Sequence, residues 1–432
     1  MTKAQLILYG GIAAITLLAI LVLTGVVPGL RESQPPKFSL TIWGADDPED
    51  LWRNLGQSYQ KANDSASIKY VAKDPKTYET ELVNALAAGK GPDIFMLPDV
   101  KISDHRDKIR PLGEGVLGYQ KRTLRAVFPD ALLDGITGTK DELLGTPLAF
   151  DTLGLFYNRD YFNAANIPLP PATWDDLVTS ARALTRYTET GSIRRSGVAL
   201  GTAANVEHAE DILLALMYQS GGTIVSRDGR IADIDNPATF SALDFYSAFA
   251  DSKKRAYSWN AFFPSSLDAF ATGETAMAFG YAADAKRIFA KNPQLNFDAA
   301  PLPRTAPESP SLSIGRFSIA TVSRLSPEWQ NAWTFLLWLQ GKSVERQYIE
   351  ALGLPPARRD LVNTKPPREY LSPFYGQVLS ARTFPLRLGA SLPGIIRDMI
   401  DEMAERRFSQ GQILTRANQR INELLAKQPK QP

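Results

Sequence analysis

The sequence contains no cysteine in 432 residues and only two histidines, His105 and His208. The absence of cysteine excludes disulfides, thiolate metal sites, a thiol nucleophile and lipidation of an N-terminal thiol. No H-E-x-x-H or G-x-S-x-G motif occurs, and two histidines leave little room for hydrolase or metalloenzyme sites built on histidine pairs. We therefore expect no metal, no other cofactor and no catalytic residue.

The sequence also lacks a stretch with a strong excess of one charge. Its 48 basic and 46 acidic residues give a net charge of +2, and the signs alternate along the chain instead of forming the basic stripe that neutralises phosphates. Nucleic acid is not an expected partner. Hydrophobic residues make up 44% of the chain, which is enough for sizeable cores. Because single cores stop growing at about 250 to 300 residues, we expect two lobes.

One long apolar run stands at the N-terminus. No charged residue occurs between Lys3 and Arg31, and residues 6–27 match the ~20 residues that a helix needs to cross a bilayer. The run is longer than the apolar core of a secretory signal, and no clear cleavage site follows it. We therefore predict an uncleaved transmembrane anchor, followed by a stiff spacer up to residue 37 that contains Pro35 and Pro36. The anchor predicts a single-pass protein of the cell membrane.

From Phe38 onward, strand and helix patterns alternate. Residues 38–43 alternate apolar and polar like a strand, and Asp47-Pro48 then supplies a cap and a first-turn proline for a helix. Residues 68–71, 94–97 and 153–157 read as further strands, and Thr173 opens a helix as part of a capping box with Asp176. Two amphipathic helices are predicted near the C-terminus, before a polar tail at residues 427–432. The alternation over residues 38–97 predicts an α/β lobe with a largely parallel sheet.

The stretch Gly113-Glu114-Gly115-Val116-Leu117-Gly118 matches the dinucleotide-binding pattern G-x-G-x-x-G by letter. That pattern binds pyrophosphate only where it follows a strand directly and opens a helix. The residues before it include Pro111 and do not read as a strand. We predict an ordinary loop.

Five stretches together carry a family resemblance. They are GTPLAFDTLGLFYNRDYF at residues 145–162, ALAAGKGPDIF at 85–95, PATWDDL at 171–177, FATGETAMA at 270–278, and AWTFLLWL at 332–339 followed by GLPPAR at 353–358. In this order they closely resemble the hinge, turn and helix signatures of the sugar-binding, maltose-binding-like family of extracellular solute-binding proteins, extracellular solute-binding protein family 1. The resemblance spans nearly everything after residue 38.

The resemblance implies a periplasmic-binding-protein-like type II fold, with two α/β lobes joined by three hinge crossings. We place these crossings near Phe150, Pro303 and Leu354. The first lobe would then comprise residues 38–149 and 303–353, and the second lobe residues 150–302 and 354–426. The family further implies an extracytoplasmic binding domain that serves the permease subunits of an ABC transporter, without catalysis.

The resemblance also implies where the ligand binds. A sugar cleft needs carboxylates that accept hydrogen bonds from hydroxyls, and aromatic faces that stack on sugar rings. By position in the family pattern, the candidate ligand contacts are Asp46, Asp47, Asp99, Asp151, Trp259, Tyr281 and Arg316. Asp47 has a second interpretation, as a cap of the helix that follows it.

The identity of the solute stays open at this point. Relatives that bind oligosaccharides often carry tryptophans where this chain reads Tyr281-Ala282-Ala283-Asp284 and Ser391-Leu392-Pro393-Gly394. A sugar or oligosaccharide is the leading expectation, beside a peptide, a polyol or another polar solute. Two other functions are alternatives: a membrane-tethered sensor or scaffold that has kept the fold, and a glycosidase that depends on a pair of carboxylates.

Overall fold

A computed structural model of the chain describes residues 2–23 and 36–427. The predicted spacer and the polar tail fall mostly outside the described residues. Residues Lys3–Leu23 form helix α1. Within the described residues, we find no helix that combines the length and the apolarity needed to cross a membrane. The predicted transmembrane helix is therefore not found there, and its last four residues, 24–27, lie outside the described part of the chain.

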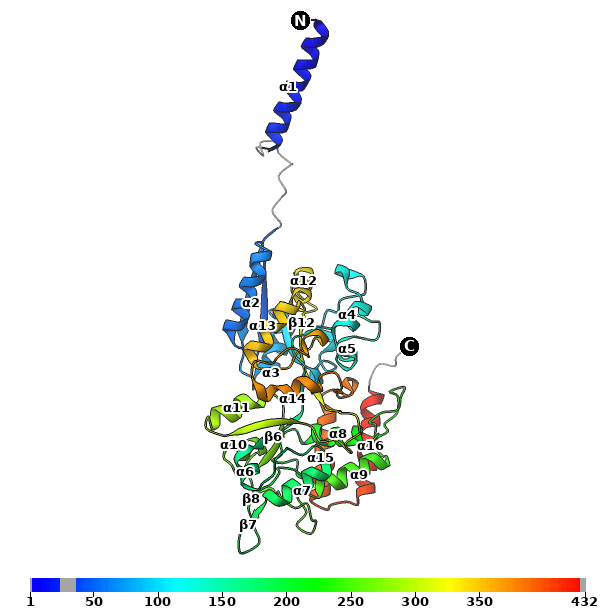
Figure 1. The fold of residues 1–432 in the computed structure, drawn as a ribbon. Coiled ribbons are helices and arrows are strands. Elements are labelled where there is room, and N and C mark those ends of the chain that lie inside the picture. Colours follow the sequence, from blue (N-terminus) through cyan, green and yellow to red (C-terminus); the bar gives the residue numbers. More distant parts are fainter. Residues whose placement is uncertain (1, 24–35, 428–432) are drawn as a thin grey trace.

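Figure 1 shows a chain folded into two lobes. The first lobe is built around a five-stranded sheet with the strand order β2-β1-β3-β12-β4. These strands are β1 (Phe38–Gly44), β2 (Ala66–Ala72), β3 (Ile94–Pro98), β4 (Thr146–Pro147) and β12 (Ser318–Val322). Strand β1 pairs in parallel with β2 and β3, whereas β12 runs antiparallel to β3 and β4. The apolar β3, in which Ile94, Phe95 and Leu97 are buried, suits this central place. The predicted α/β lobe is confirmed, but its sheet is mixed and not largely parallel, because two of its four pairings are antiparallel.

Helices surround this sheet and bury one apolar face each. They are α2 (Glu49–Ala62), α3 (Tyr78–Ala87), α4 (Lys121–Val127), α5 (Asp130–Ile136), α12 (Trp329–Leu339) and α13 (Lys342–Leu352). Helix α2 packs on β2 and buries Trp52, Leu55 and Tyr59, and α12 packs on β1, β4 and β12. Pro48 occupies the N-cap position of α2, and no side chain caps this helix. The interpretation of Asp47 as the cap is therefore wrong, and its carboxylate is free for other contacts.

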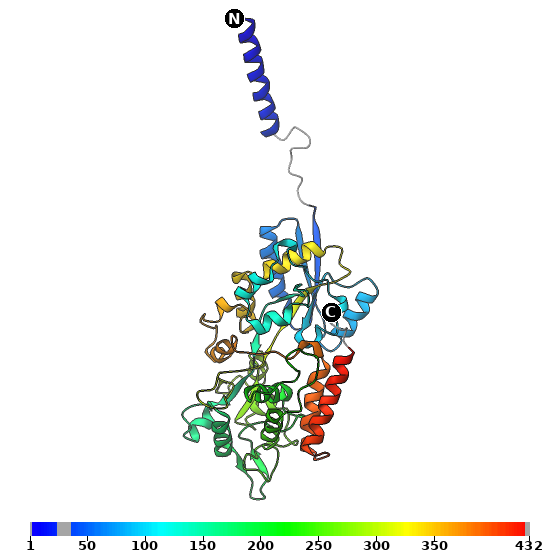
Figure 2. The same ribbon diagram turned by 90° about the vertical axis from the view of Figure 1, so that its right-hand side faces the viewer.

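The second lobe carries a three-stranded antiparallel sheet with the order β10-β6-β9. Its strands are β6 (Gly154–Asn158), β9 (Met277–Gly280) and β10 (Phe297–Pro301), and a short hairpin joins β7 (Arg186–Tyr187) to β8 (Ile193–Arg195). Its helices are α6 (Arg159–Ala164), α7 (Trp174–Leu184), α8 (Ala209–Gln219), α9 (Pro237–Ser247), α10 (Ser266–Ala271), α11 (Asp284–Lys291), α15 (Ser391–Ala404) and α16 (Gln410–Ala426). The predicted capping box of Thr173 and Asp176 opens α7. Figure 2 shows α15 and α16 side by side, and α15 packs on α8, so the C-terminal helices belong to this lobe.

A short two-stranded ribbon lies between the two sheets. Strand β5 (Asp151–Thr152) pairs antiparallel with β11 (Gly315–Arg316). The chain passes from β4 through β5 to β6, and later from β10 through β11 to β12. A third passage leads from α13 to α14 (Ser372–Gln377), which packs on β5 and β10. Residues of β5 and β11 therefore stand where the lobes meet, while the lobe boundaries given above stay a prediction.

The G-x-G-x-x-G stretch is a loop, as predicted. Gly115 and Gly118 adopt left-handed backbone angles, with φ of 82° and 76°, and only a short turn of 3-10 helix, Val116–Gly118, occurs between them. No strand of the described chain leads directly into it. A dinucleotide site is therefore excluded at this stretch.

Candidate ligand-binding cleft

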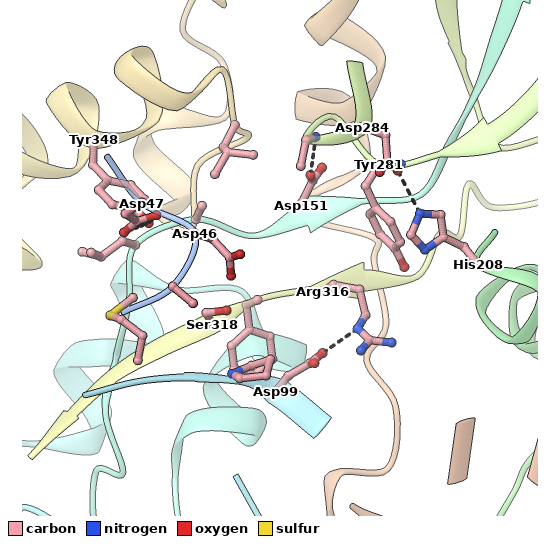
Figure 3. Close-up of a pocket in the computed structure, with 18 of the residues that line it drawn as sticks. Asp46, Asp47, Asp99, Asp151, His208, Tyr281, Asp284, Arg316, Ser318 and Tyr348 are labelled. Carbon is pink, nitrogen blue, oxygen red and sulfur yellow. Dashed lines mark hydrogen bonds and ion pairs between the residues drawn. The ribbon is translucent and has the colours of Figure 1, made fainter. Parts of the chain in front are cut away.

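A cavity of about 450 Å³ lies between the two lobes (Figure 3). The segments after β1 and β3, the ribbon strands β5 and β11, the start of α8, the β9–α11 loop and α13 all contribute to its wall. Six of the seven candidate residues line it: Asp46, Asp47, Asp99, Asp151, Tyr281 and Arg316. The fold thus brings together residues that are widely separated in the sequence.

The first lobe contributes carboxylates at the ends of two strands. Asp46 and Asp47 follow β1 and Asp99 follows β3, and because these strands are parallel, both ends meet at one edge of the sheet. The exposed Asp46 points its carboxylate into the middle of the cavity (Figure 3). Asp47 accepts hydrogen bonds from Nε1 of Trp52 at 2.8 Å and from the hydroxyl of Tyr348 at 2.9 Å. Burial raises the pKa of Asp47, and these hydrogen bonds oppose the rise.

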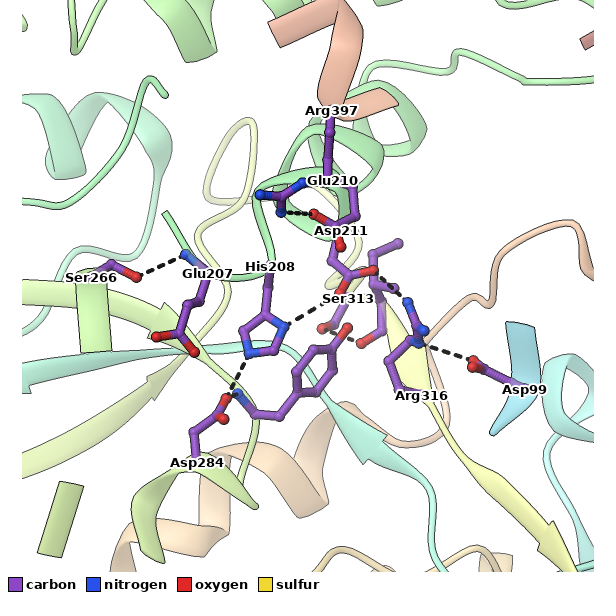
Figure 4. Close-up of polar contacts among 12 residues, drawn as sticks. Asp99, Glu207, His208, Glu210, Asp211, Ser266, Asp284, Ser313, Arg316 and Arg397 are labelled. Carbon is purple, nitrogen blue, oxygen red and sulfur yellow. Dashed lines mark hydrogen bonds and ion pairs between the residues drawn. The ribbon is translucent and has the colours of Figure 1, made fainter. Parts of the chain in front are cut away.

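Arg316 joins the two lobes through ion pairs (Figure 4). Its Nε lies 3.0 Å from Oδ2 of Asp99 in the first lobe, and its Nη1 donates to Oδ1 of Asp211 in α8 at 3.0 Å. The side chains of both carboxylates are almost completely buried, at 1% and 2% exposure. Burial raises the pKa of Asp99 to about 6, although the charge of Arg316 opposes this rise. Burial would lower the pKa of Arg316, but the two carboxylates raise it, so the guanidinium stays charged.

His208 extends this network in the second lobe. It stands directly before α8 with a left-handed φ of 60°, and its Nε2 lies 2.9 Å from Oδ2 of Asp284. Its Nδ1 lies 3.8 Å from Asp211 (Figure 4). Its ring contacts that of Tyr281 edge-on, with 4.8 Å between the ring centroids (Figure 3). Burial would lower the pKa of His208, but the hydrogen bond and charge of Asp284, with the charge of Asp211, raise it to about 9. The imidazole is therefore protonated at neutral pH.

The carboxylate of Asp151 accepts hydrogen bonds from backbone groups of the protein. Its two oxygens accept hydrogen bonds from the backbone N–H groups of Ala282 at 3.0 Å, Ala283 at 2.9 Å and Thr152 at 2.8 Å. These bonds tie β5 to the loop that carries Tyr281 (Figure 3). Burial raises the pKa of Asp151 to about 7, and the backbone hydrogen bonds oppose that rise. Asp151 thus holds a wall of the cavity in place in addition to lining it.

The structure does not bring Trp259 to the cavity. Its ring is fully buried in the core of the second lobe and stacks on Phe263 at 4.5 Å. Its Nε1 donates to Oδ1 of Asn205 at 2.9 Å. The expectation that Trp259 stacks on a ligand is corrected on this ground, because neither face of the ring is open.

Seven further polar residues line the cavity that the sequence analysis did not single out as ligand contacts: His208, Glu210, Asp211, Asp284, Tyr348, Tyr70 and Ser318. A signal for the first three was present, since they are polar residues at the start of an otherwise apolar helix. Charged side chains at the beginning of such a helix indicate an end that faces solvent or a ligand. No comparable signal marks Tyr348, which sits in an ordinary amphipathic helix.

One cluster in the described residues has the composition of a metal site. Ligand atoms of Glu207, His208 and Asp284 lie within 4.8 Å of one another. However, Arg287 binds both oxygens of Glu207, at 2.9 and 2.8 Å, and His208 is paired with Asp284. A protonated imidazole has no lone pair for a metal, so the cluster is an ion-pair network.

The fold and the cavity together define a class of protein, namely two-lobed α/β binding proteins with the site between the lobes. Comparison with solved structures shows the same fold. The chain is similar to an ABC transporter solute-binding protein of Thermotoga lettingae bound with α-D-tagatose, with 23% identity and a TM-score of 0.71 over 90% of this chain and 99% of that one. It is also similar to the sugar-binding protein MalE of Xanthomonas citri, with 17% identity and a TM-score of 0.75 over 90% and 98%. The fold is the periplasmic-binding-protein-like type II fold.

The family is shown by a match over most of the chain. The family described as bacterial extracellular solute-binding protein matches residues 54–370, so the chain belongs to this family, which consists of binding proteins and not enzymes. Among curated proteins, a putative binding protein of Brucella abortus is 20% identical over 243 residues, which is 56% of each chain. The galactooligosaccharide-binding protein of Bacillus subtilis is 25% identical over 155 residues, 34% of this chain and 35% of that one. The chain thus spans about half, or less, of the length of these curated relatives.

Proposed function

We propose that the protein is an extracytoplasmic solute-binding receptor. It captures a small polar solute, a sugar or an oligosaccharide, between its lobes and delivers it to the permease of an ABC transporter. The observation that carries this proposal is the cavity itself, because hydrogen-bonding groups from both lobes and from the connecting ribbon face one space. A solute held from both sides favours the closed arrangement of the lobes, and a permease is able to distinguish that arrangement from the open one.

In this proposal, residues on each side of the cavity have distinct roles. Asp46 and Asp47 hold the solute from the first lobe, and Tyr281 packs on it from the second lobe. Asp99 and Arg316 orient each other at the floor between the lobes, and Asp151 fixes the loop that presents Tyr281. Family membership and the sugars named for the similar proteins, α-D-tagatose and galactooligosaccharide, support the choice of a saccharide.

A thermal-shift screen of the purified full-length protein against saccharides, polyols and short peptides tests this function. A solute at about a hundred times its dissociation constant stabilises the folded state by about 2.7 kcal/mol, which raises the melting temperature measurably. We expect a saccharide to produce that shift and to be recovered unchanged. Stabilisation by peptides alone would contradict the saccharide assignment, and hydrolysis of the saccharide would contradict a pure binding role.

We further propose that the apolar segment at residues 6–27 keeps the protein attached to the cell membrane, with both lobes on the outer side. This rests on its sequence, which has no charged residue between Lys3 and Arg31. In α1, large apolar side chains such as Tyr9, Ile12 and Ile15 are at least half exposed. We expect the protein in the membrane fraction with its N-terminus intact. Cell fractionation and N-terminal sequencing check this, and a mature chain that begins near Phe38 in the soluble fraction would refute it.

A further inference from the structure

The cavity carries many more carboxyl groups than cationic side chains. Its cationic side chains are two, His208 and Arg316. Its carboxylates are seven: Asp46, Asp47, Asp99, Asp151, Glu210, Asp211 and Asp284. In a partly enclosed cavity, such an excess repels anions and raises the local concentration of cations.

Both cationic side chains already face carboxylates of the protein. Arg316 is paired with Asp99 and Asp211 at 3.0 Å each, and His208 is paired with Asp284 at 2.9 Å. An anionic solute would share these cations with the carboxylates that already hold them. Because like charges at close range repel each other, such binding is unfavourable. The cavity therefore disfavours anionic solutes.

Asp46 differs from the other carboxylates of the first lobe in the cavity. Asp47 is held by Trp52 and Tyr348, and Asp99 by Arg316. Asp46 forms no hydrogen bond or ion pair with any described residue, although it points into the middle of the cavity (Figure 3). The charge of Asp46 also raises the pKa of Asp47, although burial and the two hydrogen bonds have larger effects. The two carboxylates therefore repel each other. A positive group of a solute at this point would relieve their repulsion.

A second polar group on the opposite side of the cavity also lacks a good partner. Tyr281 is only 5% exposed, and its hydroxyl lies beside Asp211 without a well-aligned hydrogen bond. A buried hydroxyl without a hydrogen-bond partner destabilises the protein, and a hydroxyl of a solute is able to supply the missing hydrogen bond. The two sides of the cavity therefore differ, since the first lobe contributes a free carboxylate and the second lobe a neutral hydroxyl.

We propose that the solute is a hydroxyl-bearing molecule with a positively charged group, such as the ammonium of an amino sugar, and that this group binds Asp46. This proposal rests on the proposed function and names the class of saccharide. Asp46 is then the specificity-determining residue, since it is the carboxylate whose charge the protein leaves uncompensated. Hydroxyls of the same molecule face Asp47 and Tyr281.

Calorimetric titration with matched sugars tests this inference. The probes are glucose, galactose and mannose, the 2-amino form of each, and glucuronate, galacturonate and mannuronate, at a pH at which the amines are protonated. We expect at least one amino sugar to bind roughly ten- to a hundred-fold more tightly than its neutral parent, as a charge-assisted hydrogen bond provides, and the acid to bind most weakly. Neutral sugars that bind as tightly as the amino forms would overturn the inference and leave the proposed function standing. No binding of any saccharide, including oligosaccharides from the screen, would overturn both.

Two variants assign the preference to Asp46. Asp46→Asn keeps the size of the side chain and removes its charge, so the amino sugar should lose most of its ten- to hundred-fold advantage while the neutral sugar changes by only a few-fold. Asp50→Asn, at an exposed position of α2 outside the cavity, is the matched control and should leave both affinities unchanged. An advantage that survives in a folded Asp46→Asn protein would show that another group recognises the ammonium.

Discussion

Replacing Arg316 by alanine is expected to lower the free energy of unfolding by about 3 to 5 kcal/mol. The substitution leaves Asp99 and Asp211 without their ion-pair partner, and both are almost completely buried. Removing one member of a buried charge network costs far more than the network contributes relative to a neutral core, because the remaining charges cannot reach water. Urea denaturation of the wild type and the variant measures the difference.

The pH dependence of this loss identifies its cause. The pKa of Asp99 is about 6, above its ordinary value, and the charge of Arg316 opposes a further rise. Without Arg316 this pKa rises more, so the folded variant takes up a proton at acid pH and the unpaired charge disappears. The loss should therefore be largest near pH 8 and shrink as the pH falls towards about 5.

Arg287→Ala is the control for this prediction. Arg287 also binds two carboxylates, Glu207 and Asp268, but its side chain is 46% exposed and solvent screens its charge. Its removal should cost less than about 1 kcal/mol. If Arg316→Ala costs no more than Arg287→Ala near pH 8, the network does not stabilise the contact between the lobes.

Much of the fold was predictable from local patterns. The alternation in residues 38–43 gives β1, and the buried apolar run at 94–97 gives β3. The Thr173 capping box fixes the start of α7, because both of its hydrogen bonds are local. The lobes themselves follow from chain length and family resemblance rather than from periodicity, since the sequence does not show which strands pair.

The start of α2 was predicted less well. Asp47 precedes a proline, which is typical of a helix start, yet α2 begins at Glu49 without a side-chain cap. Asp47 instead accepts hydrogen bonds from Trp52 and from Tyr348, which is 301 positions away in the sequence. Tertiary contacts therefore decide how this carboxylate is used, and a local pattern does not contain them.

The candidate site was predicted where it depends on strand ends and missed where it depends on contacts between segments that are far apart in the sequence. Asp46 and Asp99 follow parallel strands, so their proximity to one edge of the sheet can be inferred from order alone. The pairs of His208 with Asp284 and of Arg316 with Asp211 join segments that are 76 and 105 residues apart. Trp259 was predicted to contact the ligand but lies in the core of the second lobe. The sequence alone does not distinguish a tryptophan that lines a cleft from one that packs in a core.

The central claim, that the solute binds between the lobes, predicts that filling the cavity abolishes binding. Ser318, the first residue of β12, lines the cavity, is exposed, and its side chain makes no hydrogen bond with a described residue (Figure 3). In Ser318→Trp, the indole would occupy space that the solute needs. Tryptophan is well tolerated in strands, and exposed substitutions usually change stability by less than about 0.5 kcal/mol, so the protein should remain folded.

The most direct measurement is titration calorimetry of the wild type, of Ser318→Trp and of Ser39→Trp with the saccharide found in the screen. Ser39 is an exposed strand residue of the first lobe that does not line the cavity, so it provides the matched control. We expect the wild type and Ser39→Trp to bind alike. Ser318→Trp should lose at least about a hundred-fold in affinity, or about 2.8 kcal/mol, while its unfolding transition stays unchanged. Unchanged affinity in a folded Ser318→Trp protein would contradict the account, because it would place the binding site outside the space between the lobes.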